Sequence, residues 1–296
     1  MLSDLLKLSK KRVGLFDGGI GTELIRQGFK SGECPEKWNI DKKDIVISIH
    51  KSYFDAGADI ITTNSFGGST IKLSSYDLGD KCYELNLAAA QLAVSVKPKD
   101  KWVAGSIGPT GKFLKPVGEY EEKDFENAFF EQIKGLKNGG VDILLMETHY
   151  DLKELICAIR AAQKLSGHPP IFATMTFNKT PRGFYTIMGN SVNQSFEELK
   201  KMGVDVVGAN CTLDSKDMSE LVKSMRESTE LPILAQANAG QPSVTSEGLV
   251  YTQSLEDYVK YIPDMIKNGA DFIGGCCGTN PEYIREMYKI IHRIKQ

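Results

Sequence analysis

The chain has 296 residues, 41% of them hydrophobic and 25% charged, with a formal net charge of −2 at pH 7. This is the composition of an ordinary globular protein, and six scattered cysteines are too few for a disulfide-stapled scaffold. Lysine and arginine are spread along the chain, so no basic block marks a nucleic-acid or anionic-lipid surface.

We interpret residues 1–12 as a short lead-in helix. Their leucines are interrupted by Asp4, Lys7 and Lys10, so the segment lacks the apolar core of a signal peptide. No stretch reaches the roughly 20 apolar residues of a membrane span. We therefore expect a cytoplasmic protein, free of membrane contact, whose cysteines serve packing, catalysis or metal binding.

From residue 13 onward, short β-branched runs alternate with longer amphipathic segments. Eight strands are predicted, at Val13–Phe16, Asp59–Thr63, Val103–Ser106, Asp142–Glu147, Ile171–Thr176, Asp205–Asn210, Ile233–Gln236 and Asp271–Gly274. Helices are predicted at Cys82–Val96, Glu122–Asn138, Leu152–Leu165, Glu197–Met202, Lys216–Ser228, Leu255–Lys267 and Pro281–Ile294. Eight strands, each followed by a helix-sized segment, are typical of a single (β/α)₈ TIM barrel of the α/β class, here one domain over residues 1–296.

A weak repeat supports this phasing. Four quartets read glycine, small residue, aspartate, apolar residue, and they begin at Gly57, Gly140, Gly203 and Gly269. We interpret each glycine as the left-handed end of a helix and each apolar residue as the start of a strand. The least regular stretches, residues 30–41, 108–119, 178–193 and 240–253, follow strand ends, where barrel loops carry chemistry.

Three cysteines lie at two of these strand ends. Cys276 and Cys277 follow the eighth predicted strand within a glycine-rich run, and Cys211 closes the sixth. Alternate strands of a barrel point side chains into a common layer, so the three sulfurs can converge on one zinc ion. Three thiolates leave the fourth position open, as in a catalytic site. The other cysteines, Cys34, Cys82 and Cys157, are interpreted as packing residues.

Other polar residues fall on the same rim. They are Asp17 after the first strand, Asn64 and Ser65 after the second, Glu147 at the end of the fourth and Asn238 after the seventh. The glycines after Asp17 do not have the spacing of a phosphate-binding loop, and an aspartate at its mouth would repel phosphate. His149 acts as a base, lines the donor channel or is a structural histidine, and the sequence leaves these alternatives open.

Several of these segments together resemble the motifs of the homocysteine S-methyltransferase family, above all the homocysteine-binding barrel of cobalamin-dependent methionine synthases. The resemblance runs in order from about Val13 to the end of the chain. It is carried by Asp17–Glu23, Thr63–Phe66, Gly105–Gly111, Glu147–Thr148, Gly208–Cys211, Asn238–Gly240 and Gly274–Thr279.

The resemblance implies a methyltransferase of methionine biosynthesis, in EC class 2.1.1. Zinc is then held by Cys211, Cys276 and Cys277, and the L-homocysteine thiolate completes the tetrahedron and is methylated to L-methionine. Asp17 and Glu147 match the family's carboxylates for the substrate amino group, and amides near Gly18 and Gly19 match those for its carboxylate. Asn238 matches the residue that fills the fourth metal position when substrate is absent.

The methyl donor is the open point of this interpretation. Betaine-using relatives carry a tyrosine where this chain has Gly67, and an open rim at Gly67 and Gly68 favours docking of a bulky corrinoid. Because the sequence ends after one barrel, we expect the methylcorrinoid to arrive on a separate protein. S-methylmethionine, a different acceptor thiol, and a non-catalytic barrel that binds homocysteine and zinc are the alternatives.

Overall fold

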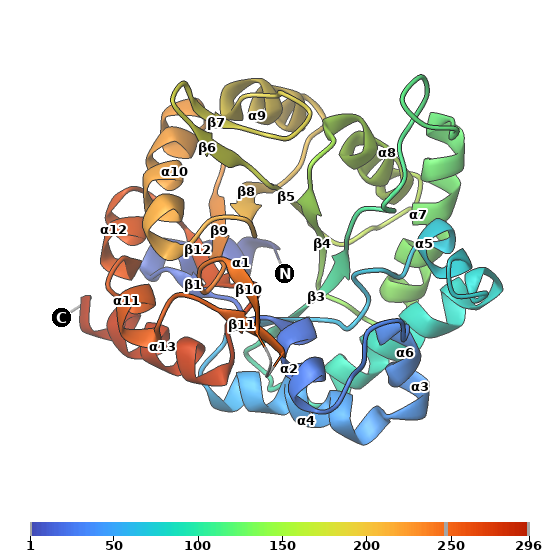
Figure 1. Ribbon diagram of the computed structural model, residues 1–296, viewed down its shortest axis with the longest axis horizontal. Helices are drawn as coiled ribbons and strands as arrows, with labels where there is room; N and C mark the ends of the chain where they lie inside the picture. Colours follow the sequence, from blue (N-terminus) through green and yellow to red (C-terminus); the bar gives the residue numbers. More distant parts are fainter. Residues whose placement is uncertain (1, 246–247, 295–296) are drawn as a thin grey trace.

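The computed structural model describes residues 2–245 and 248–294. Met1 of the lead-in segment and residues 246–247 of the predicted irregular stretch 240–253 lie outside them. Eight strands form one sheet in the order β1-β12-β9-β8-β5-β4-β3-β2, and every pair of neighbours is parallel (Figure 1). A parallel bridge between Phe16 and Ile60 joins the two outer strands, β1 and β2. The predicted (β/α)₈ barrel is thereby confirmed.

The barrel strands fall where they are predicted. They are β1 (Gly14–Leu15), β2 (Ile60–Thr62), β3 (Trp102–Ile107), β4 (Ile143–His149), β5 (Ile171–Met175), β8 (Val206–Asn210), β9 (Ile233–Ala237) and β12 (Phe272–Gly275). The helices that surround them in Figure 1 are α2 (Ile20–Arg26), α3 (Trp38–Asp41), α4 (Lys43–Asp55), α5 (Thr70–Ser74), α6 (Cys82–Ser95), α7 (Glu122–Asn138), α8 (Leu152–Gln163), α9 (Val192–Lys201), α10 (Ser215–Ser228), α11 (Leu255–Val259), α12 (Ile262–Lys267) and α13 (Pro281–Ile294). Two short 3₁₀ helices, η1 (Pro35–Lys37) and η2 (Gly79–Lys81), complete the helical elements.

The core has two layers. One lies between the strands and the helices and holds most of the buried apolar side chains. The other fills the barrel, where the rings of Phe16, Phe172 and Phe272 pack against one another with centroids 5.5–6.2 Å apart. Helix α1 (Leu2–Lys11) adds the fully buried Leu5 to this inner layer. Side chains therefore fill the interior of the barrel in the described part of the chain.

The repeated quartets end helices and also link neighbouring strands through hydrogen bonds. Their glycines adopt the left-handed conformation as predicted, with φ between 73° and 106° at Gly57, Gly140, Gly203 and Gly269. Each following aspartate also accepts a hydrogen bond from a strand amide of another barrel strand. The pairs are Asp59 with Leu15, Asp142 with Val103, Asp205 with Ile171 and Asp271 with Ile233. The aspartates thus join strands at the N-terminal end of the barrel.

Several predicted boundaries are wrong. Helix α9 begins at Val192 rather than Glu197, because Ser191 and Gln194 form a capping box there. The single helix predicted over Leu255–Lys267 is two helices, and Pro263 lies in the first turn of the second, where its missing N–H costs nothing.

Two loops predicted as irregular contain β-hairpins. These hairpins pair β6 (Asn178–Thr180) with β7 (Gly183–Tyr185) and β10 (Pro242–Thr245) with β11 (Gly248–Tyr251). Among the described residues, no helix is long and apolar enough to cross a membrane.

Candidate metal centre and substrate pocket

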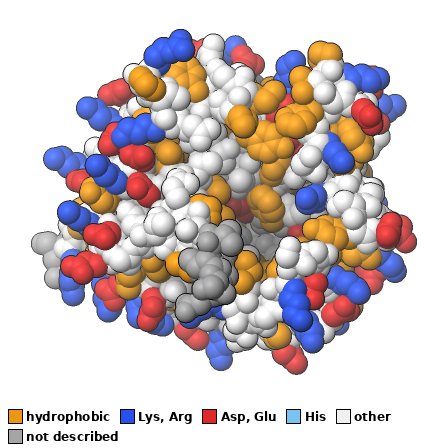
Figure 2. Space-filling model, viewed as in Figure 1, with side chains coloured by type: hydrophobic (Ala, Val, Ile, Leu, Met, Phe, Trp, Pro, Cys, Tyr) orange, Lys and Arg blue, Asp and Glu red, His pale blue; other side chains and the backbone are white. Residues whose placement is uncertain are grey.

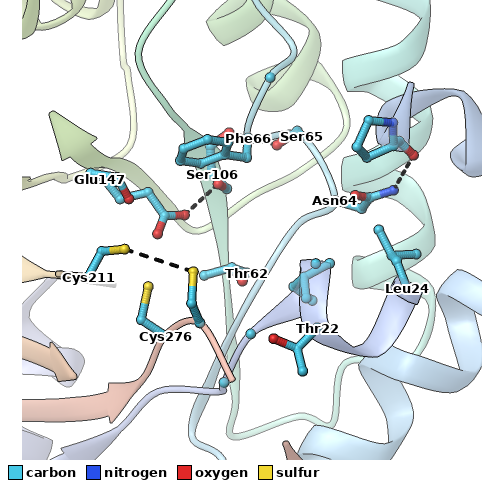
Figure 3. Close-up of a pocket in the computed structure, with 18 of the residues that line it drawn as sticks. Thr22, Leu24, Thr62, Asn64, Ser65, Phe66, Ser106, Glu147, Cys211 and Cys276 are labelled. Atoms are coloured by element: carbon cyan, nitrogen blue, oxygen red, sulfur yellow. Dashed lines mark hydrogen bonds between the residues drawn. The ribbon is translucent and has the colours of Figure 1, made fainter. Parts of the chain in front are cut away.

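A cavity of about 360 Å³ opens at the C-terminal end of the barrel. It is lined by residues at the ends of the barrel strands or just after them, including Gly18, Thr62, Glu147 and the three rim cysteines. Figure 2 shows this face of the molecule, with hydrophobic side chains gathered beside the central hollow. Figure 3 shows Cys211 and Cys276 directed toward the same space as Glu147.

The sulfurs of Cys211, Cys276 and Cys277 lie within 4.8 Å of one another, and the Cys211 and Cys277 sulfurs are 3.8 Å apart. Two thiolates bound to one tetrahedral metal at about 2.3 Å lie about 3.8 Å from each other. The predicted convergence of the cysteines is therefore present, and its spacing fits a zinc ion with one position left for another ligand.

The backbone at both strand ends is bent to bring the sulfurs together. Cys211 and Thr212 adopt left-handed conformations with φ of 65° and 57°, which turn the chain out of β8. After β12 the amide of Cys276 donates to the carbonyl of Ala237 at 2.8 Å, and Gly278 has a φ of 82°. The strand has ended before both cysteines, so neighbouring side chains can face one point.

The three thiols of the cluster differ in the direction in which their pKa is shifted. Hydrogen bonds from Cys276 and Cys277 lower the pKa of Cys211 to about 3, and the interaction with Cys211 raises the pKa of Cys277 to about 12. The pKa of Cys276 is raised for the same reason. The cluster thus accepts one negative charge readily and resists the next two, which a divalent cation would offset.

Asp17 is fully buried, whereas its neighbours Gly18 and Thr62 line the cavity. Its Oδ2 accepts hydrogen bonds from the Thr62 amide at 2.7 Å and from the Thr62 hydroxyl at 3.1 Å, while Oδ1 has no partner in the described part of the chain. Burial raises the pKa of Asp17 to about 8. A buried carboxylate oxygen without a partner is costly unless a ligand supplies one.

Glu147 is the second acid of the cavity. It accepts hydrogen bonds from the Ser106 hydroxyl and from the Asn210 side-chain amide, and burial raises its pKa to about 7. No salt bridge joins Glu147 or Asp17 to a basic side chain among the described residues. A buried acid and a half-buried acid without a cation form a site of high affinity for a positively charged group.

Asn210 is a site residue whose role was not predicted. Its side chain accepts from the Thr148 amide at 2.7 Å and donates to the Thr148 hydroxyl at 2.7 Å. Thr148 has a φ of 61°, and Asn210 fixes this strained residue beside Glu147. The motif containing Asn210 is visible in the sequence, but this contact between β4 and β8 is tertiary.

The glycines after Asp17 permit close contact with the cysteine turn. A Cβ atom on Gly18 would lie 2.7 Å from the Thr279 hydroxyl, and one on Gly19 would lie 2.8 Å from the Cys276 carbonyl oxygen. The Gly19 amide donates to the Thr279 hydroxyl at 3.2 Å. Of the two predicted carboxylate-binding amides, the Gly18 amide is the one without an acceptor in the described chain.

Asn238 and His149 hold the backbone around the site. The Oδ1 atom of Asn238 accepts from the Cys277 amide at 3.1 Å. His149 is fully buried, packs on Phe129 and lies 3.2 Å from the Ile107 carbonyl oxygen, and burial lowers its pKa to about 4. His149 does not line the cavity, so the structural interpretation holds.

Known proteins resemble nearly the whole chain. The family model described as homocysteine S-methyltransferase matches residues 14–291. The methionine synthases of Mycobacterium leprae and Mycobacterium tuberculosis are 32% and 31% identical over 98% and 99% of the chain, which spans about a quarter of their length. The metallated form of the homocysteine methyltransferase MmuM from Escherichia coli has the same fold, with a TM-score of 0.80 at 20% identity and 96% and 98% of the two chains covered.

Proposed function

Because the chain belongs to the homocysteine S-methyltransferase family, we propose that it methylates the thiol of L-homocysteine to form L-methionine. The observation that carries the proposal is the joining of two features in one cavity. Three sulfurs suited to a metal line the cavity together with Glu147, and the buried Asp17 lies just beyond its lining, so that two acids suited to an amino group lie near the sulfurs. A barrel that merely stored zinc would need no such acids.

Cys211, Cys276 and Cys277 would hold a zinc ion in this proposal. Bound zinc is a Lewis acid that keeps a thiol deprotonated near neutral pH, where a free thiol with a pKa near 8.5 is largely protonated. Three cysteine ligands leave one position for the substrate sulfur, whereas a fourth would close the site. The proposal places the protein in a compartment such as the cytoplasm, where thiols stay reduced.

The chain's own residues would bind and orient homocysteine. Asp17 and Glu147 hold its ammonium group, which supplies the missing partner of Asp17 Oδ1 and the missing counter-charge of both acids. The Gly18 amide is available for the substrate carboxylate. Fixing both ends of the amino acid head directs its short thiol arm toward the cysteines. The methyl then forms a bond to that sulfur as its bond to the donor breaks.

The proposed donor is a methylcorrinoid carried by a protein module other than this barrel. The resemblance of the sequence motifs to the homocysteine-binding barrel of cobalamin-dependent methionine synthases supports a corrinoid over a small donor, and two similar proteins are named methionine synthases. Gly67 also occupies the position of the betaine-binding tyrosine, so the rim has no aromatic ring at that position to contact a quaternary ammonium. A Cβ at Gly67 would lie 3.0 Å from Glu36 Oε1, which leaves little room for a larger residue.

A methylation assay tests the activity. Purified zinc-loaded protein is given L-homocysteine with a methylcorrinoid protein, methylcobalamin, S-methylmethionine or betaine in turn, and methionine is measured. We expect turnover with the corrinoid. Turnover with a small donor alone would replace the proposed donor, and no turnover with any of the four would overturn the proposed reaction.

Metal analysis tests the ligands separately. Cys276→Ala should lower the zinc content well below one ion per chain and abolish methionine formation, because two thiolates and water hold zinc weakly. Cys157→Ala, which removes a fully buried sulfur elsewhere, should retain the zinc. Unchanged zinc in Cys276→Ala would contradict the ligand assignment.

A further inference from the structure

Gln236 is a buried residue of the cavity wall whose side-chain oxygen has no donor. It belongs to β9, which lies between the two strands that carry the cysteines, and it is 3% exposed and lines the cavity. Its Nε2 donates to the Gly275 carbonyl at 3.3 Å, whereas its Oε1 has no hydrogen-bond partner in the described part of the chain. A buried acceptor without a donor is costly unless a ligand or a water supplies one.

The alternation of side chains along the barrel strands directs Gln236 toward the cavity. Leu234 belongs to the apolar layer that fills the barrel, and residues two positions apart on a strand point to the same face. Gln236 therefore points inward, one layer closer to the C-terminal end. On β4 the same relation holds between Leu145 of the apolar layer and Glu147, which also lines the cavity. Gln236 and Glu147 thus belong to one polar layer above the apolar one.

Gly274 and Gly275 of β12 bring Gln236 next to Asp17. A Cβ on Gly274 would lie 3.0 Å from the Asp17 carbonyl oxygen and 3.3 Å from Gln236 Cγ, so both residues pack against that glycine. The Gly275 amide donates to the Asp17 carbonyl at 2.9 Å, and the Gly275 carbonyl accepts from the Gln236 side chain. Asp17 and Gln236 are therefore neighbours held by the same short stretch of backbone.

These residues present acceptors that fit one class of ligand. Asp17 Oδ1 and Gln236 Oε1 are both buried and without donors in the described residues, and Glu147 adds a carboxylate with only neutral partners. A carboxylate or carbonyl group of a ligand would meet only other acceptors here. A primary ammonium group carries three N–H donors and a positive charge, so it can donate once to each of the three side chains.

We propose that Gln236 is a substrate-binding residue whose Oε1 accepts one of the three hydrogen bonds of the homocysteine ammonium group, beside Asp17 and Glu147. The inference rests on the proposed function, since that function supplies the ammonium group. It also gives the cavity a selectivity. A thiol without an amino group leaves Gln236 Oε1 unpaired, and a site built to hydrogen-bond a group discriminates against ligands that lack it.

The test compares thiols that carry different parts of homocysteine. Zinc-loaded wild type, Gln236→Met and Gln236→Glu are titrated calorimetrically with L-homocysteine, with 3-mercaptopropylamine, which lacks the carboxylate, and with 4-mercaptobutanoate, which lacks the amino group. Methionine keeps the length of the side chain without its polar atoms, whereas glutamate keeps an acceptor in place of Oε1. The matched control is Gln163→Met, at an exposed glutamine of α8 that does not line the cavity.

In Gln236→Met we expect L-homocysteine and 3-mercaptopropylamine to bind roughly tenfold more weakly than to wild type, which is the loss of one hydrogen bond to a charged group. Binding of 4-mercaptobutanoate should be unchanged, and the control should bind all three thiols as wild type does. Gln236→Glu should bind both amines at least as tightly as wild type.

The failure of this inference is distinct from the failure of the proposed function. Equal weakening of all three thiols in Gln236→Met, or no weakening of any, overturns the inference alone when the zinc content is that of wild type. Weaker binding of both amines to Gln236→Glu overturns it as well, whether or not Gln236→Met folds. Zinc-loaded wild type that binds none of the three thiols overturns the proposed function together with the inference.

Discussion

The buried and half-buried aspartate and glutamate residues have different partners at the two ends of the barrel. At the N-terminal end Asp59 accepts two hydrogen bonds from Arg12, at 2.6 and 2.7 Å, and one from Lys101 at 2.8 Å. Asp142 pairs with Lys97, and Asp271 pairs with Arg226. At the C-terminal end Asp17 and Glu147 have only neutral partners in the described residues.

This difference separates acids that stabilise the fold from acids that await a ligand. Burial alone would raise the pKa of Asp59, but the hydrogen bonds and charges of Arg12 and Lys101 outweigh it and lower that pKa. Burial raises the pKa of Asp17 to about 8 and that of Glu147 to about 7, with no cation to oppose it. The folded protein therefore keeps two acids in an unfavourable state at the rim, as expected of a site for a cationic group.

The largest effect on stability is expected at the N-terminal end. Asp59→Ala should lower the free energy of unfolding at pH 7 by about 3 kcal/mol, because it leaves Arg12 and Lys101 without their shared partner. Chemical denaturation measures the loss. Asp41→Ala, at an exposed pair with Lys37, should change stability by less than about 0.5 kcal/mol. Zinc content per folded molecule should be unchanged in both variants. Loss of zinc from Asp59→Ala would show that the acids at the N-terminal end also support the metal site.

The next effect concerns the ligand and should appear only at the C-terminal end. Asp17→Asn should weaken L-homocysteine binding to the zinc-loaded protein roughly 10- to 100-fold, the value of a hydrogen bond to a charged group. Calorimetric titration measures it. A thiol without the amino acid head, 2-mercaptoethanol, should bind both proteins equally. Equal weakening of both ligands would show that Asp17 supports the metal rather than the ammonium group.

The sequence predicts the fold well because its signals are local. Left-handed glycines and β-branched runs fix the phase of the eight strands, and the same phase places the three cysteines on one rim. The sequence predicts no role for the aspartate of each quartet, since its bond to the amide of a distant strand leaves no local signature. The hairpins were missed because their pairing depends on loop geometry rather than on a hydrophobic period.

The site was predictable in its residues but not in their contacts. Asp17, Glu147 and the cysteines stand out at strand ends, and the structure brings them to one cavity with Asp17 buried just beyond its lining. The bonds of Asn210 to Thr148 and of Asn238 to Cys277 join separate elements of the chain. No spacing in the sequence encodes such contacts.

The smallest predicted effect is on the pH dependence of stability. Replacing an aspartate by asparagine should raise the free energy of unfolding at the C-terminal end of the barrel and lower it at the N-terminal end. The folded-state pKa of Asp17 is raised from 3.8 to about 8, so its contribution to stability is fully present below pH 3.8 and is lost as the pH rises through 8. Asp17→Asn removes this loss of stability. Without homocysteine, the free energy of unfolding of the variant should therefore exceed that of wild type by at least about 1 kcal/mol between pH 5 and pH 8.

Asp59→Asn should do the reverse. The folded-state pKa of Asp59 is lowered, so its contribution is present above pH 3.8 and is lost only as the pH falls through the folded-state value. The variant should therefore be less stable than wild type throughout pH 5–8. Denaturation of both variants and wild type across this range, at equal zinc content, checks the pair. A loss of stability in Asp17→Asn at pH 8 would mean that the rim acids are as well compensated as those at the other end, and that no cationic ligand is needed to explain them.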